Sequence, residues 1–268
     1  MYQQNHSGAG AARNLGMEKA KGQFLVFLDA DDRFDKNLID LSLKQIKKAK
    51  ADVCIFRAEQ FWHGTTKKEN LDFAYDVDHF PKKEVFSAKD FPERVFNCFQ
   101  NWTWNKIFRK SFVKKNNLKF QEINKTNDLL FVCLALIKAE RITTLNKVLV
   151  SYRKNTGTST QDTNDRSPLE FLKAFNALEE NLKKSNDWSL YRKSFYNHKI
   201  GGAMYNLHSL KTKKAFILLY KDLKIHASRD LNNISKDDSY NLSRYSQYLD
   251  ILTMSQDSYI KKYNIKLS

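Results

Sequence analysis

A short apolar run that stops at a group of carboxylates constrains this chain more than any other feature. Residues 23–28 read Gln-Phe-Leu-Val-Phe-Leu, and Asp29, Asp31 and Asp32 follow directly. A continuous apolar run of this length is typical of a strand that is buried on both faces of a sheet. In open α/β sheets, ligands bind beyond the carboxyl ends of the strands. The sequence therefore predicts a ligand site at residues 28–32.

The segments beside this strand predict an α/β sheet domain. Small and apolar residues recur at helical spacing over residues 7–22, which indicates a helix before the strand. After the strand, Asp35 is expected to cap a second helix with an apolar face, and residues 53–56 are expected to form another strand. Alternating helices and strands are typical of α/β folds.

Further along the chain, local patterns predict more elements of the same domain. They are an irregular excursion over residues 62–86, a helix opened by Ser87 and Asp90, a short helix near 111–116, an apolar helix over 129–139 capped by Thr126 or Asn127, and a strand over 148–152.

The composition changes near Thr156. Residues 156–165 are polar and are expected to form a loop. Ser167-Pro168-Leu169-Glu170 then predicts a helix start, with Ser as the cap, Pro in the first turn and Glu at the capping-box position. The remaining pattern is helical, so we predict a sheet domain over residues 1–160 and an all-helical appendage over 161–268.

The overall composition is that of a folded protein of a reducing compartment. The chain has 268 residues, of which 41% are hydrophobic, so it can bury a core. Cys54, Cys98 and Cys133 lie in apolar surroundings without metal-ligand spacing and are expected to be buried free thiols. Without a signal peptide or membrane-spanning run, the expected location is the cytoplasm, with peripheral attachment at the inner face of the cell membrane as an addition.

The net charge of +16 indicates an anionic partner. Basic residues are spread along the chain, and no zinc-finger, homeodomain or RNP-like pattern accompanies them. An anionic membrane surface or a phosphate-bearing substrate is therefore favoured over nucleic acid. A solvated basic surface without a specific partner is the alternative.

Carboxylates at the end of a buried strand are suited to bind a hard cation. Their oxygens are ligands for Mg²⁺ or Mn²⁺, and such an ion also holds a diphosphate and neutralises a departing phosphate. A helix cap alone is the structural alternative, although Asp35 already takes that place. A haloacid-dehalogenase-type phosphohydrolase also begins with a strand and Asp-x-Asp, but Arg33 or Phe34 stands where that class carries Thr or Val.

The segments that flank the acidic run point to one family. Asn5-His-Ser-Gly-Ala-Gly-Ala-Ala-Arg-Asn-Leu-Gly precedes the strand, Trp104-Asn105-Lys106-Ile107-Phe108-Arg109 follows later, Asn127-Asp128 opens an apolar helix, and Tyr152-Arg153 precedes a polar loop. In this order, these motifs closely resemble family 2 glycosyltransferases of the GT-A fold, over roughly residues 5–159.

The resemblance implies a donor site around the acidic run. Asp29 and Asp31 match the Asp-x-Asp pair of the family, with Asp31 as the direct metal ligand and Asp29 beside the ribose and diphosphate. Asp32 is expected to orient the loop or contact the sugar. Mn²⁺ or Mg²⁺ is the implied cofactor.

The helix before the strand is implied to line the nucleotide pocket. Gly8, Gly10, Arg13 and Asn14 match that segment of the family. Glycines there let the backbone approach a ligand, and Arg13 is suited to pair with phosphate. A salt bridge on the helix surface is the alternative for Arg13.

The remaining implied site residues lie in the second half of the domain. Asp128 matches the position of the general base, although Asn127 replaces the usual Glu before it, and a helix cap is the alternative for Asp128. Trp104 is implied to stack on a sugar, with a place in the core as the alternative. Asn105, Tyr152 and Arg153 are weaker candidates for acceptor or diphosphate contacts.

The implied reaction is an inverting transfer from a nucleotide-sugar, UDP-linked by family analogy, to a hydroxyl of a glycan, a lipid-linked or a protein-linked acceptor. Asp128 takes the proton of that hydroxyl, while the metal and Arg13 stabilise the leaving diphosphate. Such enzymes serve cell-surface polysaccharide or glycoconjugate assembly.

The chain also departs from the family pattern. The apolar-Pro-x-Tyr-Asn strand and the Asp-Asp-Gly-Ser turn that normally precede these motifs do not occur, so we expect a GT-A domain that lacks its N-terminal portion. Two hypotheses follow: a cytoplasmic, peripheral glycosyltransferase, or a non-catalytic homologue that docks on a membrane or a partner through its basic helical region.

Overall fold

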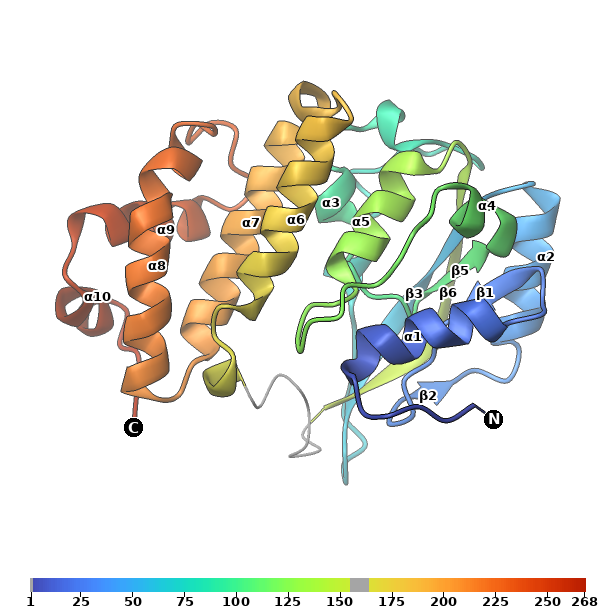
Figure 1. Ribbon diagram of the computed structural model, residues 1–268, viewed down its shortest axis with the longest axis horizontal. Coiled ribbons are helices and arrows are strands. Elements are labelled where there is room, and N and C mark those ends of the chain that lie inside the picture. The colour runs from blue at the N-terminus through green and yellow to red at the C-terminus, as the bar shows by residue number, and fades with distance from the viewer. Residues whose placement is uncertain (1, 155–163) are drawn as a thin grey trace. The chain divides into compact units, whose positions relative to one another are not determined.

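The structure is a computed structural model that describes residues 2–154 and 164–268 (Figure 1). The chain divides into two compact units, Met1–Thr158 and Ser159–Ser268. The domain boundary expected after residue 160 lies outside the described residues, as does most of the loop expected over 156–165.

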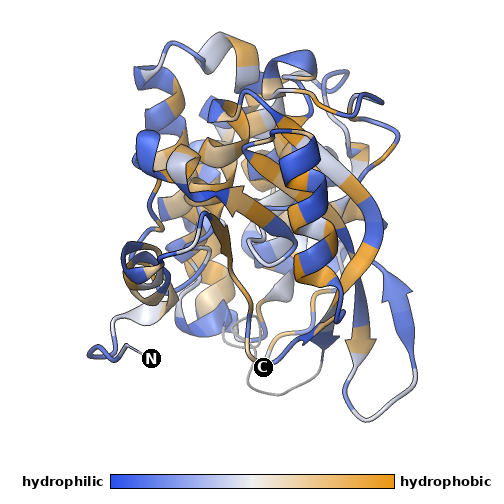
Figure 2. Ribbon diagram, turned by 90° about the vertical axis from the view of Figure 1, so that its right-hand side faces the viewer, coloured by the Kyte–Doolittle hydropathy of each residue, from blue (hydrophilic) through white to orange (hydrophobic). Residues whose placement is uncertain are grey.

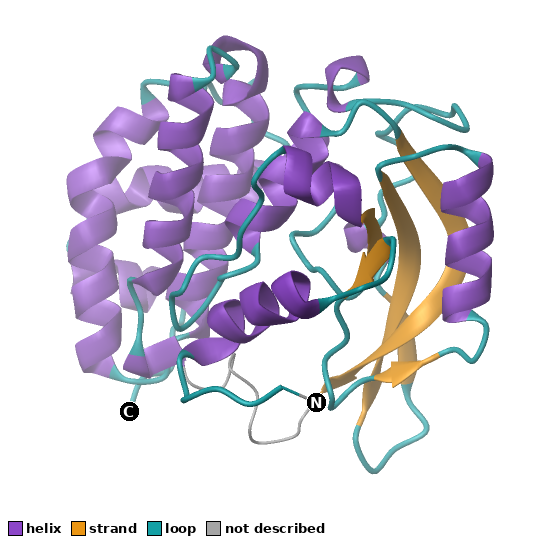
Figure 3. Cartoon of the chain, turned by 45° about the vertical axis from the view of Figure 1, so that its right-hand side comes forward, coloured by secondary structure: helices purple, strands orange, loops and turns teal. Residues whose placement is uncertain are grey.

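The N-terminal unit is built on one mixed sheet, whose strands are drawn in orange in Figure 3. Their order is β1-β5-β3-β6-β2, with β4 paired to β3 beyond the main path. Their bounds are Phe24–Val26 for β1, Arg33–Phe34 for β2, Val53–Trp62 for β3, Lys68–Asn70 for β4, Lys106–Arg109 for β5 and Ile142–Lys154 for β6.

The centre of the sheet is the parallel pair β3 and β6, in which Val53 pairs with Ile142 and Trp62 with Lys154. The other pairings are antiparallel. The first four residues of β3 are all buried, as the apolar run at 53–56 predicts. Both strands are longer than expected, and both become less buried toward their ends: the last four residues of β6 are all half-exposed.

The strand expected over residues 23–28 is shorter and less buried than predicted. Strand β1 contains three residues, of which only Leu25 is buried, and within the described sheet it pairs with β5 alone. Leu28 is 46% exposed. The prediction of a strand buried on both faces is therefore wrong: an apolar run reports hydrophobicity but not the place of a strand in the sheet.

Helices cover both faces of this sheet (Figure 3). The helices of the N-terminal unit are α1, Gly8–Lys19; α2, Leu38–Lys48; α3, Val95–Cys98; α4, Lys110–Lys115; and α5, Leu129–Lys138, with one-turn 3₁₀ helices η1 at Asp72–Ala74 and η2 at Ala88–Asp90.

Helix α2 packs on one face of the sheet through Leu38 and Ile46, which join Cys54 and Phe56 of β3 in a single core cluster. Asp35 does not cap this helix, contrary to the sequence-based expectation. The N-cap residue is Asn37, and the Asp35 carboxylate instead accepts a hydrogen bond of 2.8 Å from the backbone N–H of Asn37. Asp35 thus closes the turn before the helix.

Aromatic rings fill the opposite face of the sheet. Phe131 of α5 packs edge-on against Phe108 of β5, with ring centroids 5.2 Å apart. Phe120 stacks on Phe131 at 4.2 Å, and Phe27 lies 5.0 Å from Phe120. This cluster fixes the start of α5 close to the end of β1, where the acidic run begins.

Other expectations in this unit are met in part. Ser87 and Asp90 form a capping box, but it opens the single turn η2 and not a longer helix. The segment expected to be irregular over 62–86 contains the hydrophilic strand β4 (Figure 2) and η1. Helix α5 begins after Asp128, so neither Thr126 nor Asn127 is its cap residue.

The C-terminal unit is helical in its described part, as the sequence predicts. Its helices are α6, Glu170–Lys184; α7, Trp188–Ser209; α8, Lys213–Leu231; α9, Leu242–Thr253; and α10, Gln256–Lys262. Helix α6 begins later than expected, at Glu170, with Leu169 as its N-cap residue.

The three cysteines are buried free thiols, as expected. Burial raises the pKa of Cys54 and of Cys98 to about 12, so both are uncharged at neutral pH. Among the described residues, no helix is long and apolar enough to cross a membrane.

Candidate functional site

The acidic run forms a tight turn at the end of β1. The backbone N–H of Asp32 donates to the carbonyl of Asp29 over 3.2 Å. The turn places the three carboxylates in different environments: Asp29 is half-buried, Asp31 is exposed and Asp32 is buried. One local turn therefore presents one carboxylate to solvent and holds another inside the protein.

Asp32 anchors the turn to β6. Its Oδ1 accepts a hydrogen bond of 2.8 Å from the backbone N–H of Arg153, while its Oδ2 is buried without a hydrogen-bond partner among the described residues. Burial raises the pKa of Asp32 to about 7, and the negative charges of Asp31 and Asp29 add to the rise. The loop-orienting role implied for Asp32 agrees with this contact, whereas direct sugar contact does not follow from its burial.

Arg13 of α1 joins the acidic turn to the beginning of α5. Its Nη2 donates to Oδ1 of Asp29 over 2.8 Å, and its Nη1 donates to Oδ1 of Asn127 over 2.7 Å. The guanidinium also lies over the Phe120 ring, 5.5 Å from its centroid. A single planar cation thus connects three segments that are distant in sequence.

Gly10 permits the close approach of α1 to residues 121–127. A Cβ at Gly10 would lie 2.0 Å from the carbonyl oxygen of Gln121. The structure thus gives Gly10 a packing role, whereas the sequence-based expectation was that its backbone approaches a ligand. Gly8, with φ of +82° and open space around it, is the glycine of this segment that leaves room for a ligand.

Asn14 also holds α1 in place. Its side-chain amide donates to the Phe120 carbonyl over 3.0 Å, and its Oδ1 accepts from the Phe120 N–H over 2.9 Å. The Asn14 amide thus both donates to and accepts from the backbone of Phe120, as a paired residue of a neighbouring strand would. Asn14 is therefore engaged by the protein backbone, and its contribution to a nucleotide pocket is through the position of α1.

Asp128 lies at the first turn of α5, half-buried. It occupies the N-cap position, but its side chain makes no capping hydrogen bond. Its Oδ1 accepts instead from the amide of Asn101 over 3.2 Å. Burial raises the pKa of Asp128 to about 6, while the charge of Arg13 and the bond from Asn101 oppose that rise. A carboxyl of this pKa is ionised at neutral pH and can accept a proton.

Asn101 and Lys106 are the residues near Asp128 to which the sequence interpretation gave no role. Lys106 was noted only as part of a motif, because the sequence pattern does not show whether a lysine in a strand is buried. Nothing in the sequence indicates that Asn101 meets Asp128, since the two are separated by 27 positions.

Two predicted contact residues are unavailable to a ligand. Asn105 is 1% exposed, and its Oδ1 accepts from Lys106 over 2.7 Å. Trp104 is 4% exposed and packs against two neighbouring aromatic rings, 4.7 Å from Trp102 and 5.8 Å from Tyr152. The structure thus supports the core alternative for Trp104, and it leaves no exposed surface of Asn105 for an acceptor.

Tyr152 and Arg153 lie in the last part of β6. Tyr152 belongs to the stack with Trp104 and is half-buried. The Arg153 guanidinium lies over the Phe61 ring, 5.6 Å from its centroid. Arg33 lies over the same ring at 4.4 Å. The backbone of Arg153 reaches the acidic turn through Asp32, while its side chain rests on β3.

The acidic turn fits a cation that substrate phosphates help to hold. Among the described residues no three His, Cys, Asp or Glu side chains converge as a complete metal site. Mg²⁺ and related ions are commonly held by one or two carboxylates with phosphates and water as the other ligands. Asp31 is exposed, and one oxygen of Asp29 is taken by Arg13. Asp31 is thus the principal candidate ligand, with Asp29 secondary.

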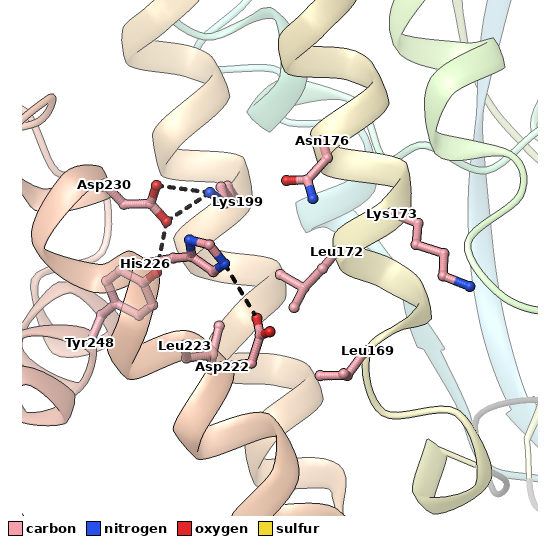
Figure 4. Close-up of a pocket in the computed structure, with 10 residues that line it drawn as sticks. All are labelled: Leu169, Leu172, Lys173, Asn176, Lys199, Asp222, Leu223, His226, Asp230 and Tyr248. Atoms are coloured by element: carbon pink, nitrogen blue, oxygen red, sulfur yellow. Dashed lines mark hydrogen bonds and ion pairs between the residues drawn. The ribbon is translucent and has the colours of Figure 1, made fainter.

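The helical unit contains a separate pocket lined by α6, α7, α8 and α9 (Figure 4). At its inner end, Lys199 and Asp230 form a buried ion pair of 2.7 Å. Oδ2 of Asp230 also accepts from the Tyr248 hydroxyl over 2.8 Å. Lys199 and Asp230 are thus paired and hydrogen-bonded within the protein. A buried ion pair needs such partners to be stable, so we interpret this pair as structural.

Residues 1–116 match the family model described as glycosyl transferase family 2. This match supports the resemblance of the N-terminal unit to family 2 glycosyltransferases. Together with the mixed α/β architecture, this match agrees with the GT-A type that the sequence resemblance implies, and it disfavours the haloacid-dehalogenase interpretation.

Curated relatives of this chain extend the similarity beyond the matched residues. EpsH of Bacillus subtilis, which carries glycosyltransferase in its name, is 26% identical over 71% of this chain and 54% of its own length. The cholesterol galactosyltransferase of Borreliella burgdorferi is 21% identical over 73% of this chain and 56% of its own length. The chain thus spans about half the length of these relatives.

A solved structure is also similar to this chain. It is the crystal structure of residues 1–349 of Staphylococcus aureus TarS in complex with UDP-GlcNAc, which is 17% identical with a TM-score of 0.47. The similarity covers 97% of this chain and 74% of that chain.

Proposed function

We propose that this chain transfers a sugar from a UDP-linked donor to a hydroxyl acceptor, with inversion at the anomeric carbon and with Mn²⁺ or Mg²⁺ as cofactor. The observation that carries the proposal is the Arg13 bridge. It brings Asp29 of the acidic turn and Asn127, the neighbour of Asp128, to opposite ends of one guanidinium. Groups suited to a diphosphate and a group suited to take a proton are thereby joined in one site.

The acceptor side of the reaction rests on Asp128. Its carboxylate, oriented by Asn101, takes the proton of an acceptor hydroxyl as that oxygen attacks the anomeric carbon. A base with a pKa of about 6 is ionised at neutral pH and remains basic enough to assist the attack.

The donor side of the reaction rests on Arg13 and the acidic turn. When bound at Asp31 and Asp29, a divalent cation supplies positive charge to the diphosphate. Arg13 is half-buried, and its guanidinium adds a fixed positive charge beside Asp29, where charge develops on the leaving group. The oxocarbenium character of such a transition state requires no covalent bond to the protein.

The proposal names the donor and the acceptor by chemical class and not as single compounds. Two curated relatives carry a donor sugar in their names, the galactosyltransferase above and TarS, a poly(ribitol-phosphate) beta-N-acetylglucosaminyltransferase that is 24% identical over 53% of this chain. Their acceptors differ in chemistry, a sterol and a phosphate polymer. We therefore propose a hexose or N-acetylhexosamine donor and a glycan, lipid-linked or protein-linked acceptor in cell-surface assembly.

Calorimetric titration of the purified chain with UDP-sugars tests this proposal. We expect binding that requires Mn²⁺ or Mg²⁺ and that weakens at least tenfold in Asp31→Ala. Asp40→Ala is the matched control, because Asp40 is an exposed acid in the first turn of α2. Binding that is absent with every UDP-sugar, or that is equal in parent and Asp31→Ala, would contradict a metal-dependent donor site.

A second role is favoured by one surface of α8. Leu218 and Ile225 are 49% and 74% exposed and lie seven residues apart, so they share a face of the helix. The exposed Lys214 and Lys221 lie along the same stripe. We propose that this face, Lys214–Leu218–Lys221–Ile225, contacts an anionic membrane surface, as apolar side chains flanked by lysines do. This is also the role left to the chain if it is a non-catalytic docking homologue.

Sedimentation with lipid vesicles tests the membrane contact. Vesicles with phosphatidylserine are expected to bind the chain in a salt-sensitive way, and the double variant Leu218→Ser with Ile225→Ser is expected to lose most of that binding. The matched control is Leu242→Ser with Leu249→Ser, since these residues of α9 are also exposed at the same spacing. Equal binding by both double variants would rule out the α8 face.

A further inference from the structure

The ammonium group of Lys106 of β5 is fully buried, and burial lowers its pKa to about 7. Its relative exposure is 0%, and its Nζ donates three hydrogen bonds of 2.7 Å, to the carbonyl of Gln100, the carbonyl of Trp102 and Oδ1 of Asn105. An ammonium group has three donors, so all of them are used. A charge buried with this degree of satisfaction has a specific structural task, because removing it from water is costly.

The two carbonyls that Lys106 binds stand on either side of Asn101. The backbone from Gln100 to Asn105 forms neither helix nor strand, and its bond to the sheet is the one that the Phe56 N–H donates to the carbonyl of Asn105 over 3.1 Å. At Gln100 and Trp102 the Lys106 ammonium donates the bonds that a sheet partner would otherwise give. The position of Asn101 is consequently set from both sides by one side chain.

Asn101 in turn is the contact between this segment and the proposed base. Its amide donates to Oδ1 of Asp128 over 3.2 Å. We infer that Lys106 is a positioning residue, whose ammonium clamps the backbone around Asn101 and thereby holds the Asn101 amide against the Asp128 carboxylate. The inference rests on the proposed function for its catalytic consequence, but the clamp itself is a physical connection that can be measured without substrate.

The first turn of α5 thus has two supports from different parts of the unit. Arg13 reaches it from α1 through Asn127, and Lys106 reaches it from β5 through Asn101. The charge of Asp128 also opposes the fall that burial causes in the pKa of Lys106. The two groups are therefore coupled electrostatically as well as through Asn101.

Two variants test the clamp. Lys106→Met keeps a long side chain and removes the three donors, whereas Asn101→Ala leaves the clamp and removes only its contact with Asp128. The matched control is Lys110→Met, since Lys110 is a half-buried lysine of the same unit that donates to a backbone carbonyl, that of Ala20, away from Asp128.

The first measurement is the pKa of the Asp128 carboxyl by ¹³C NMR, which needs no substrate. Loss of a hydrogen bond to the charged form raises the pKa of an acid, so we expect a rise of about half to one pH unit in Asn101→Ala and at least as much in Lys106→Met. Lys110→Met should leave it unchanged. A folded Lys106→Met chain with the parental pKa of Asp128 would overturn the inference.

The second measurement is steady-state transfer. Both site variants are expected to lower kcat about tenfold or more with little change in KM for the donor, and the double variant is expected to lose no more than the worse single one, because both act through the same contact. If Lys106→Met does not fold, Asn105→Ala replaces it, since this change removes one acceptor of the ammonium. A smaller rise in the pKa of Asp128 is then expected, and no rise would overturn the inference.

These outcomes separate the inference from the proposed function. A raised pKa of Asp128 in both site variants, with no transfer by the parent, supports the clamp and counts against the enzyme. Transfer by the parent, with Lys106→Met equal to Lys110→Met in kcat and in the pKa of Asp128, supports the enzyme and rejects the clamp.

Discussion

Gly10 and Gln121 lie so close that a single added carbon at Gly10 would be 2.0 Å from the carbonyl oxygen of Gln121. The two residues are more than a hundred positions apart, yet their backbones are in contact. This contact sets how near α1 comes to the first turn of α5, and thus whether Arg13 reaches Asn127.

Substitution of Gly10 tests the importance of that contact. In Gly10→Ala the new Cβ collides with backbone, which cannot rotate away as a side chain would. We expect a loss of about 2 kcal/mol in the free energy of unfolding, measured by urea denaturation. Weaker binding of UDP-sugar should accompany it, because α1 must move away from residues 121–127.

Gly16 provides the matched control within the same helix. A Cβ at Gly16 meets nothing within 4 Å, so Gly16→Ala should stabilise the chain by about 0.5–1 kcal/mol through helix propensity. Equal effects of the two substitutions would mean that α1 does not pack on residues 121–127 as described.

Arg13 is expected to matter for binding more than for stability. It bridges Asp29 and Asn127. In its ion pair with Asp29, the Arg13 side chain is 19% exposed and the Asp29 side chain is 37% exposed. An ion pair of that exposure contributes only about 1 kcal/mol to folding. In Arg13→Gln, affinity for UDP-sugar should fall at least tenfold in calorimetric titration, because a fixed positive charge beside the diphosphate is lost.

Arg57 offers a close match for this comparison. It also bridges an Asp and an Asn, Asp72 and Asn146, in the same unit. Arg57→Gln should lower stability to a similar extent and leave donor affinity within twofold of the parent. If both variants weaken binding alike, the effect belongs to the stability of the unit and not to a donor site at Arg13.

Local features of this fold were predictable from the sequence, whereas contacts between distant segments were not. Helix α1, the acidic turn and α5 each follow from spacing and composition within a dozen residues. The meeting of Arg13 with Asn127 depends on the packing of Gly10 on Gln121, for which no local pattern exists. The sequence indicated Arg13 as a phosphate ligand only through family resemblance.

Burial caused the main errors in the sequence interpretation. The apolar strand at 23–28 was expected inside the sheet, but strand order is not encoded in hydrophobicity. The family resemblance implied ligand contacts for Asn105 and for Trp104, with the core as the alternative for Trp104, yet Lys106 binds Asn105 and neighbouring rings cover Trp104. The burial of Lys106 against backbone carbonyls depends on tertiary packing, and composition does not predict it.

The pH dependence of transfer should report on Asp128. Because burial raises its pKa to about 6, the carboxyl is increasingly protonated below that pH and cannot accept a proton. We expect kcat/KM to fall tenfold per pH unit on the acid side of about pH 6, and Asp128→Asn to lower kcat by a factor of about 10² or more. The comparison is a pH–rate profile of parent and variant with a UDP-sugar and Mn²⁺.

Asp187→Asn is a suitable control for that profile, since Asp187 lies before α7 in the helical unit. It should retain both the parental rate and the parental acid limb. An acid limb well below pH 5, or a rate in Asp128→Asn equal to that of the control, would remove Asp128 from the role of base.

The stability of the chain should fall in mild acid because of His198 in α7. Burial lowers the pKa of His198 to about 4 from its ordinary value of 6.5, so the folded protein keeps the ring neutral. Between those two values the unfolded chain binds more protons than the folded one, and its free energy falls relative to the folded state. The contribution of His198 is therefore fully present above about pH 6.5 and is lost as the pH falls toward 4.

The variant His198→Gln isolates this effect, because glutamine is polar and does not titrate. Urea unfolding at pH 7 and pH 4 should show that the parent loses about 2 kcal/mol more than His198→Gln over this interval. His226→Gln is the control, since the His226 side chain is 43% exposed and should leave the parental loss intact. The Phe175 ring lies 5.2 Å from that of His198, so a charged imidazole has an apolar neighbour at this position. Equal acid sensitivity in all three chains would show that another group governs the acid unfolding.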